Sequence, residues 1–225
     1  GIDKSTASRI LATFARHDMA YKEPGTQKYR LSAGPLLFSY RVASVNEIIG
    51  LAHPILGELA AETGETAHLC AMQRGRIYML DQVKSSRNRY MKDAALPGMR
   101  EPFHSSAVGK VILAYMEPEE AVGILKSSRL DIFTDKTISD ADTLLGQFVE
   151  IRKRGYAVDD EEYSPGVVCV AVPVFDRYGR VFHSIGISGD DGSMRSAAFR
   201  ERMLPALIRA GKKLTKKYTG SSASG

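Results

Sequence analysis

The chain has 225 residues, of which 44% are hydrophobic and 25% charged, as is ordinary for a soluble globular protein of one or two domains. Its longest apolar run, Val167–Phe175, is far shorter than the roughly 18 residues needed to cross a bilayer. No charged-then-apolar leader opens the sequence, so we expect a cytoplasmic protein without a membrane partner. The two cysteines, Cys70 and Cys169, lie far apart, which argues against a disulfide framework or a four-thiolate zinc site.

The formal net charge of +5 is concentrated at the two ends of the chain. Residues 1–31 contain six basic and three acidic residues, and residues 200–225 contain seven basic and one acidic residue. The residues between them are therefore mildly acidic. A basic N-terminus on an acidic body favours an N-terminal segment that faces DNA.

The first 31 residues are expected to form a helix and a hairpin. Residues 5–17 have apolar side chains at helical spacing, with Ser5 as the expected N-cap. Short strands are predicted at 19–22 and 28–31, separated by the turn residues Pro24-Gly25. A polar and basic helix followed by a basic hairpin fits a winged helix-turn-helix on DNA. The same pattern fits a surface helix and hairpin of another α+β domain equally well.

Two consecutive helices are predicted next. The first covers residues 36–45, and Asn46 is expected to cap a second one that ends at Thr63, before Gly64. An apolar stripe on the first helix is too long to remain in water, so we expect it to pack against a second copy of the chain. Its members are Leu36, Leu37, Tyr40 and Ala43.

From Glu65 onward the apolar period changes to two, which predicts strands. Hairpins grouped at both ends of a helical middle predict an α+β fold with an antiparallel sheet. The expected elements are strands 66–72 with 76–83, strands 167–175 with 181–188, helices at 107–116, 118–126, 139–154 and about 196–218, and a disordered Gly/Ser tail at 220–225. The third of these helices is expected to start in a capping box at Ser139 to Asp142.

Several spaced sequence blocks resemble the IclR (isocitrate lyase regulator) family of bacterial transcription factors. These blocks are Lys4 to Leu11 with Tyr29-Arg30-Leu31, His104 to Lys110, Gly155 to Glu162, Gly166 to Val174, and Ile185 to Gly189. The resemblance implies a partial winged helix-turn-helix at 1–32, a linker helix at 33–47 and a PAS/GAF-like effector domain at 48–219. Family members carry two further helices before the recognition helix, on which this chain almost begins.

The resemblance also implies function and site residues. It implies a repressor or activator that binds operator DNA as a homodimer or a dimer of dimers. Its C-terminal domain is expected to bind a small effector, a carboxylate, and to mediate oligomerisation. The residues expected to contact DNA are Lys4, Ser5, Thr6, Ser8, Arg9, Thr13, Lys28 and Arg30. The residues expected to bind the effector are Ser106, Ala107, Val108, Asp159, Cys169, Gly186 and Ser188.

Each of these effector residues has a simpler structural interpretation. The helix that begins near Ala107 offers unpaired N–H groups to an anion, but it also fits an ordinary capped helix. The acidic run from Asp159 to Glu162 fits a solvated turn, and Cys169 fits a small buried hydrophobic residue. Gly186 occupies a position where the family often has a serine, so we expect one hydroxyl fewer and more room for a ligand.

No metal, cofactor or enzymatic site is predicted. His68 and Cys70 share a strand face, but two ligands do not make a metal site. An active site could be assembled from Cys169, His104 and the acidic run, but no nucleophile elbow, phosphate-binding glycine loop or paired metal motif accompanies them. The leading hypothesis is therefore a regulator and not an enzyme. The alternative is a stand-alone sensory module that acts through protein partners.

Overall fold

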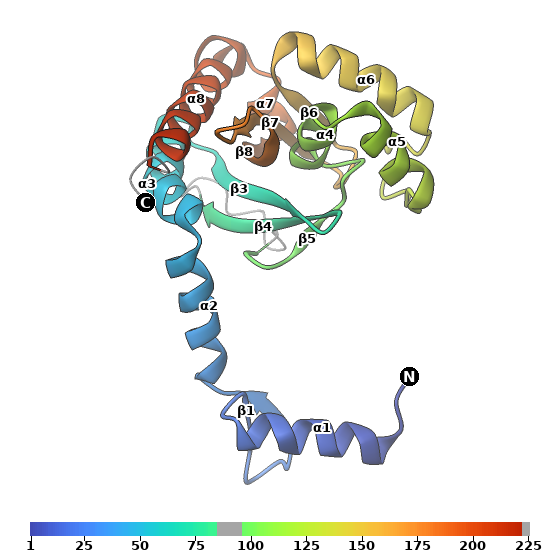
Figure 1. The fold of residues 1–225 in the computed structure, drawn as a ribbon, viewed down its shortest axis with the longest axis vertical. Coiled ribbons are helices and arrows are strands. Elements are labelled where there is room, and N and C mark those ends of the chain that lie inside the picture. The colour runs from blue at the N-terminus through green and yellow to red at the C-terminus, as the bar shows by residue number, and fades with distance from the viewer. Residues whose placement is uncertain (85–95, 222–225) are drawn as a thin grey trace. The chain divides into compact units, whose positions relative to one another are not determined.

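The structure of this chain is a computed structural model that describes residues 1–84 and 96–221 (Figure 1). It divides into two units, Gly1–Gly50 and Leu51–Gly225. Among the described residues, no helix is both long enough and apolar enough to span a membrane. The expectation of a disordered tail falls largely on residues 222–225, which lie outside the described residues.

The N-terminal unit contains the predicted helix and hairpin, followed by a second helix. Its elements are α1 (Lys4–Arg16), β1 (Ala20–Lys22), β2 (Tyr29–Leu31) and α2 (Gly34–Val45), with β1 and β2 antiparallel. The predicted N-cap of α1 is wrong. Asp3 caps the helix instead of Ser5, because Asp3 Oδ1 accepts hydrogen bonds from the backbone N–H groups of Ser5 (2.9 Å) and Thr6 (3.0 Å).

Helix α3 (Glu47–Thr63) begins directly after Asn46 and ends before Gly64, as predicted. Gly64 has a φ of 77°, in the left-handed region that glycine adopts without strain. The helix contains Pro54 in its interior and faces the C-terminal unit with buried side chains such as Ile55, Leu56 and Leu59. It therefore contributes directly to the core of that unit.

A six-stranded antiparallel sheet with the order β5-β4-β3-β8-β7-β6 forms the centre of the C-terminal unit. Its strands are β3 (Thr66–Gln73), β4 (Arg76–Val83), β5 (Arg100–Glu101), β6 (Ala157–Asp160), β7 (Val167–Phe175) and β8 (Val181–Asp190). The two predicted hairpins, β3 with β4 and β7 with β8, are confirmed and lie side by side through the β3–β8 pairing. The two edge strands, β5 and β6, were not predicted because each is too short to show a period.

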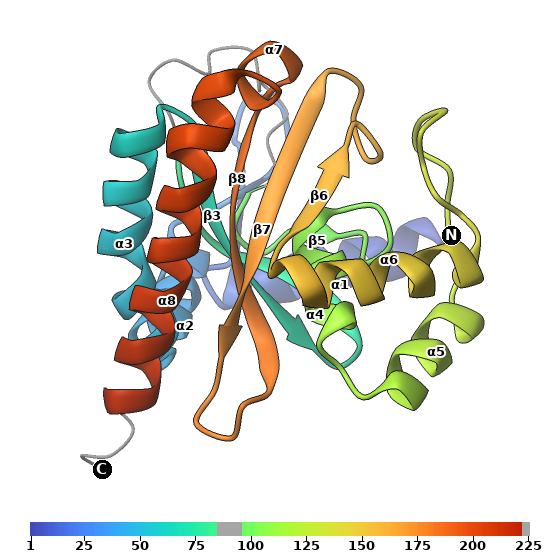
Figure 2. The same ribbon diagram turned by 90° about the horizontal axis from the view of Figure 1, so that it is seen from above.

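Helices cover both faces of this sheet, which confirms the α+β class (Figure 2). Helices α3 and α8 (Leu204–Ser221) lie on one side, and α4 (Ala107–Ala114), α5 (Pro118–Ser127) and α6 (Ala141–Arg154) lie on the other. Helix α4 packs against β6, β7 and β8, and α8 packs against β7 and β8. The core on the α4 side is a continuous apolar cluster that contains Cys70, Val111, Phe148 and Ala171.

Two predicted helix boundaries in this unit are wrong for identifiable reasons. Helix α6 starts at Ala141 because Asp140, and not Ser139, caps it through a 2.8 Å hydrogen bond from Thr143 N–H to Asp140 Oδ2. The single final helix expected at about 196–218 is two elements, a π-helical turn η1 (Phe199–Met203) and α8, and a short helix α7 (Asp191–Met194) precedes them. Pro205 has no N–H to donate to residue 201, so the regular helical ladder cannot pass through this point.

Candidate functional site

Three of the predicted effector residues form a row across neighbouring strands. Asp159 on β6 pairs in register with Cys169 on β7, which pairs in register with Ser188 on β8. Register partners project from the same face of a sheet, so all three side chains face α4. The Cys169 Sγ–Ser188 Oγ distance is 3.1 Å, and the Ser188 Oγ–His68 Nδ1 distance is 3.4 Å. The structure therefore brings these residues together as a continuous polar row.

Asp159 is a buried carboxyl group, not part of a solvated turn. Its side chain is 2% exposed, and its Oδ1 accepts hydrogen bonds from the backbone N–H groups of Glu162 (2.7 Å) and Tyr163 (3.3 Å). Burial raises the pKa of Asp159 to about 7, although these two N–H groups oppose the shift. Near neutral pH this carboxyl can therefore either accept or donate a hydrogen bond to a ligand.

The N-terminus of α4 packs over the face of the sheet that carries this polar row. Ser106 is the N-cap: its Oγ accepts a hydrogen bond from Gly109 N–H (3.1 Å) and donates one to the Pro102 carbonyl (2.6 Å). The backbone N–H groups of Ala107 and Val108 make no hydrogen bond with any of the described residues. Both residues are buried in the same apolar cluster against which Cys169 packs. A helix N-terminus with free N–H groups thus lies next to the polar row.

Glu101 is a further acidic group that sequence reasoning missed. It lies on edge strand β5, while Asp159 lies on the opposite edge strand β6. Burial raises the pKa of Glu101 to about 7, and the charge of Asp159 adds to the shift, so the sheet curls enough to bring the two into electrostatic range. Its Oε1 is buried and has no hydrogen-bond partner among the described residues. The only sequence signal was an acidic residue directly before Pro102-Phe103.

The space expected at Gly186 is occupied. A Cβ atom at this position would lie 2.6 Å from His68 Nε2 and 2.9 Å from the Val170 carbonyl oxygen. The imidazole of His68 therefore fills the room that the missing side chain leaves, which corrects the expectation of extra space for a ligand. Burial lowers the pKa of His68 to about 4, so the ring is neutral at physiological pH.

A buried ion pair links α4 to the turn that follows β6. Lys110 on α4 and Glu162 after β6 are 1% and 6% exposed at their side chains, with Nζ and Oε1 2.5 Å apart. Lys110 Nζ also lies 3.4 Å from Gln147 Oε1 on α6. Because the Glu162 N–H holds Asp159, this pair ties α4 to the turn that positions the Asp159 carboxyl. Neither residue was singled out from the sequence.

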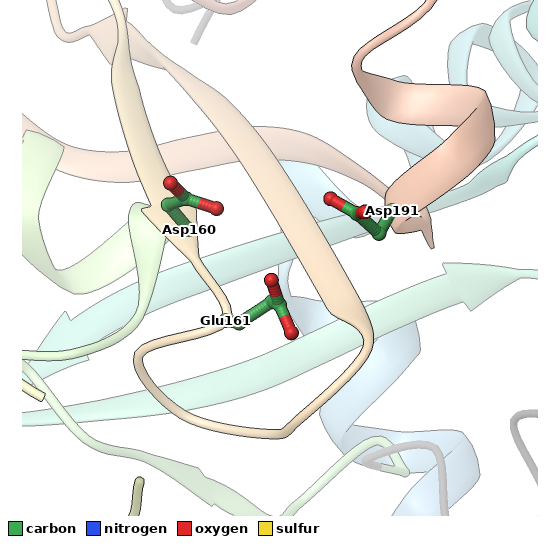
Figure 3. Close-up of side chains that lie close together, drawn as sticks. All are labelled: Asp160, Glu161 and Asp191. Carbon is green, nitrogen blue, oxygen red and sulfur yellow. The ribbon is translucent and has the colours of Figure 1, made fainter. Parts of the chain in front are cut away.

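Three carboxylates, those of Asp160, Glu161 and Asp191, form a group that could geometrically hold a metal ion (Figure 3). Arg195 hydrogen-bonds to the side chains of all three, and Lys136 forms an ion pair with Glu161. The carboxylates are therefore neutralised by the chain's own cations. The four residues of the acidic run differ in burial: Asp159 and Glu162 are buried, and the two residues between them are partly exposed.

The predicted DNA-contacting residues lie on the surface of the N-terminal unit. Lys4, Ser5, Ser8, Arg9 and Thr13 are exposed on α1, as are Lys28 and Arg30 on the hairpin, whereas Thr6 is half-buried. The Ser5 and Thr6 hydroxyls donate to Asp3, and Arg30 Nε lies 3.0 Å from Glu23 Oε1. Lys4, Arg9 and Lys28 are therefore the cations of the set whose side chains make no hydrogen bond or ion pair with the described residues.

Comparison with known proteins gives one consistent result. The family model described as "Bacterial transcriptional regulator IclR C-terminal" matches residues 40–216. The HTH-type transcriptional regulator BhcR of Paracoccus denitrificans is 34% identical over 213 residues, which cover 94% of this chain and 75% of BhcR. The HTH-type transcriptional regulator KdgR of Escherichia coli is 33% identical over 187 residues, 83% of this chain and 70% of KdgR.

The solved structures agree with the sequence comparisons. The crystal structure of the Thermotoga maritima IclR superposes with a TM-score of 0.83 at 27% identity, covering 97% of this chain and 87% of that one. Because the match covers 97% of this chain, it includes residues of both units. By its family model, its relatives and its fold, the chain belongs to the IclR family of bacterial transcriptional regulators.

Proposed function

We propose that this chain is a DNA-binding regulator whose C-terminal domain binds a small organic acid and, in response, changes its affinity for an operator. We assign to it the domains expected from the sequence: a partial winged helix-turn-helix at 1–32, a linker helix at 33–47 and an effector domain at 48–219. The observation that carries the proposal is the free N-terminus of α4 beside the buried row of Asp159, Cys169 and Ser188. The relatives named above are HTH-type transcriptional regulators.

The geometry supports an effector with two kinds of group. The N–H groups of Ala107 and Val108, with the dipole of α4, favour a carboxylate. The Asp159 carboxyl and the Ser188 hydroxyl favour a hydroxyl or keto group at the other end, since both can donate as well as accept a hydrogen bond near neutral pH. Cys169 supplies an apolar wall with a weak donor, because burial holds the pKa of its thiol well above the usual range.

The remaining assigned residues shape this site. Ser106 fixes the start of α4 through its capping hydrogen bonds. Gly186 admits the His68 ring, so the effector meets a neutral imidazole there instead of a hydroxyl. Burying a ligand carboxylate against a few charge-assisted contacts, each contributing about 1.5–3 kcal/mol, is sufficient for micromolar binding.

DNA binding is assigned to the N-terminal unit, and self-association to the effector domain together with helix α2 of the N-terminal unit. Lys4, Ser5, Thr6, Ser8, Arg9 and Thr13 face the operator from α1, and Lys28 and Arg30 contact its backbone from the hairpin. Helix α2 leaves large apolar side chains in water, with Leu36 69%, Leu37 60% and Tyr40 68% exposed. A second copy of the chain covers this face in a homodimer or a dimer of dimers, as an operator read by paired domains requires.

The decisive experiment places a carboxylate where the effector's carboxylate is proposed to bind. Small organic acids are first screened by thermal shift on the wild-type chain, and the best binder is then titrated against Ala107→Asp. This variant should lose binding, because two like charges cannot share one helix N-terminus. The matched control is Gly123→Asp on the exposed surface of α5, where an added side chain meets no other atom.

Ala107 is buried, so a second variant guards against a folding defect. Ser188→Ala removes one hydroxyl without adding charge and should weaken the same acid about tenfold, as expected for one lost hydrogen bond. If Ala107→Asp binds the acid normally, or if only cations bind the wild-type chain, the proposed effector site is wrong.

A further inference from the structure

A second groove lies outside the proposed effector site. It has a volume of about 460 Å³ and is formed by β7, the last turn of α6 and one flank of α8. Its floor is apolar and includes Val172, Phe175 and Ile208, with the Tyr115 ring packed edge-on against Phe175 at 5.4 Å. None of the residues assigned to the effector site lines it. The volume falls within the range of about 300–1,000 Å³ that is typical of small-molecule sites.

The rim of this groove is entirely basic. Five cationic side chains and no acidic ones line it: Arg152, Lys153, Arg154, Lys212 and Lys216. The side-chain ammonium groups of Lys212 and Lys216 make no hydrogen bond or ion pair with any residue in the ranges 1–84 and 96–221. They are four residues apart and therefore project from the same side of α8, together with Ile208 of the floor.

On the other flank of α8, the basic residues have acidic partners. There a groove of about 330 Å³ is lined by Arg209 and Lys213, but acidic residues of α3 also line it. Arg209 pairs with Glu62 at 2.6 Å, and Lys213 pairs with Glu58 at 2.5 Å. One helix thus has its basic residues neutralised by the chain on one side and left unneutralised on the other.

Helix capping does not account for the unneutralised charge. Basic residues in the last turn of α6, such as Arg152 and Arg154, interact favourably with the negative end of the helix dipole. Both also donate hydrogen bonds to backbone carbonyls. Lys212 and Lys216 lie in the interior of α8, where the dipole offers no such compensation. Gly211, directly before Lys212, allows α8 to approach β7, since a Cβ there would lie 2.6 Å from Val172 Cγ2.

We propose that this groove is a second small-molecule site, which binds an organic anion with an apolar body of one or two rings. The apolar floor would bury the rings, and Lys212 and Lys216 would hold the anionic group at the rim. Charge complementarity selects an anion, because no acidic residue in the groove could hold a cation. This proposal does not depend on the assigned effector site.

The test uses a matched pair of fluorescent probes on the full chain. 1-Anilinonaphthalene-8-sulfonate has two aromatic ring systems and a sulfonate, whereas N-phenyl-1-naphthylamine has the same rings without the charge. The sulfonate probe should bind saturably with one site per chain, and added NaCl should weaken it. The double variant Lys212→Met/Lys216→Met should raise its Kd about tenfold and leave the uncharged probe unaffected.

Two controls make the result specific. Lys213→Met, on the neutralised flank of the same helix, should change the Kd less than about twofold, as expected for an exposed charge outside the site. Ala107→Asp should also leave the Kd unchanged, since the effector site is separate. The proposal is overturned by any of three results: no saturable binding, an unchanged Kd in the double variant, or loss of binding in Ala107→Asp. A change in the sedimenting mass of the double variant would also overturn it, because the groove would then be an interface between copies.

Discussion

Residues 1–50 leave large apolar side chains in water, with Phe14 49%, Leu36 69% and Phe38 58% exposed, whereas residues 51–225 bury even charged groups such as Lys110 and Asp159. Exposed apolar surface of this extent costs free energy unless something covers it, so the first unit is built to meet other molecules. Buried ionisable groups also cost free energy, and in the second unit they surround the site proposed for the effector. The difference is the one expected if, as proposed, the first unit contacts macromolecules and the interior of the second binds a small ligand.

The largest expected effect concerns the buried ion pair of the second unit. Lys110→Met should lower the free energy of unfolding by about 3–5 kcal/mol, because it leaves Glu162 as an uncompensated buried charge. The double variant Lys110→Met/Glu162→Leu should recover most of this loss. Urea denaturation followed by far-UV circular dichroism measures both, since the chain has no tryptophan. Equal stability of the single variant and the wild type would mean that the pair is not buried in solution.

The same leucine truncation should have opposite consequences in the two units. Leu144→Ala removes a fully buried side chain and should cost about 2–5 kcal/mol of unfolding free energy. Leu36→Ala on α2 should change the stability of the folded monomer by less than about 0.5 kcal/mol. It should instead weaken self-association, as measured by sedimentation equilibrium at micromolar concentration. A strictly monomeric wild-type chain would contradict the proposed role of α2.

The buried carboxyls should make stability depend on pH. The pKa values of Asp159 and Glu101 are both raised to about 7, so their contribution to stability is fully present below about pH 4 and is lost as the pH rises through 7. Asp159→Asn keeps the acceptor for two backbone N–H groups but cannot ionise. It should therefore stabilise the chain at pH 8 by about 2–3 kcal/mol relative to the wild type and have little effect at pH 4.

Thermal unfolding across pH 4 to 8 provides this measurement, with Glu119→Gln on the exposed surface of α5 as the matched control. The control should stay within about 0.5 kcal/mol of the wild type. His68 opposes the trend, because its pKa is lowered to about 4 and its contribution is lost as the pH falls. The comparison between variant and wild type removes that contribution. An Asp159→Asn variant less stable than the wild type at pH 8 would show that the carboxyl is ionised and needed there.

The smallest expected effects concern DNA contacts of the first unit. In a chain extended at its N-terminus by the two helices that family members carry, Arg9→Ala should weaken operator binding by about 1–3 kcal/mol. Lys28→Ala should mainly reduce the salt dependence of binding, because it removes one phosphate contact. Gel shifts at several salt concentrations measure both. Lys126→Ala on α5 is the control, and gel shifts that no variant alters would rule out α1 and the hairpin as the DNA-contacting elements.

Local sequence patterns determined most of the elements of this fold. The alternating apolar residues on each side of a turn predicted the β3–β4 and β7–β8 hairpins, since a two-residue period and a turn are properties of a short segment. The helix that starts at Ala107 and the break between helices at Asn46 were also predicted, because helical spacing and capping residues are likewise properties of a short segment. Capping was predicted less well, because neighbouring Ser and Asp residues compete for one position and side-chain geometry decides between them.

Only the tertiary structure decided what surrounds the site. Lys110 and Glu162 are 52 positions apart in the sequence, and Ser188 and His68 are 120 apart, so no local period relates them. Glu101 enters the site because the sheet curls and brings the charge of one edge strand within range of the other. His68 fills the space at Gly186 because two strands pair in one register. Close packing and electrostatics act through space, and they are therefore fixed by the pairing of distant segments and not by the residues next to each group.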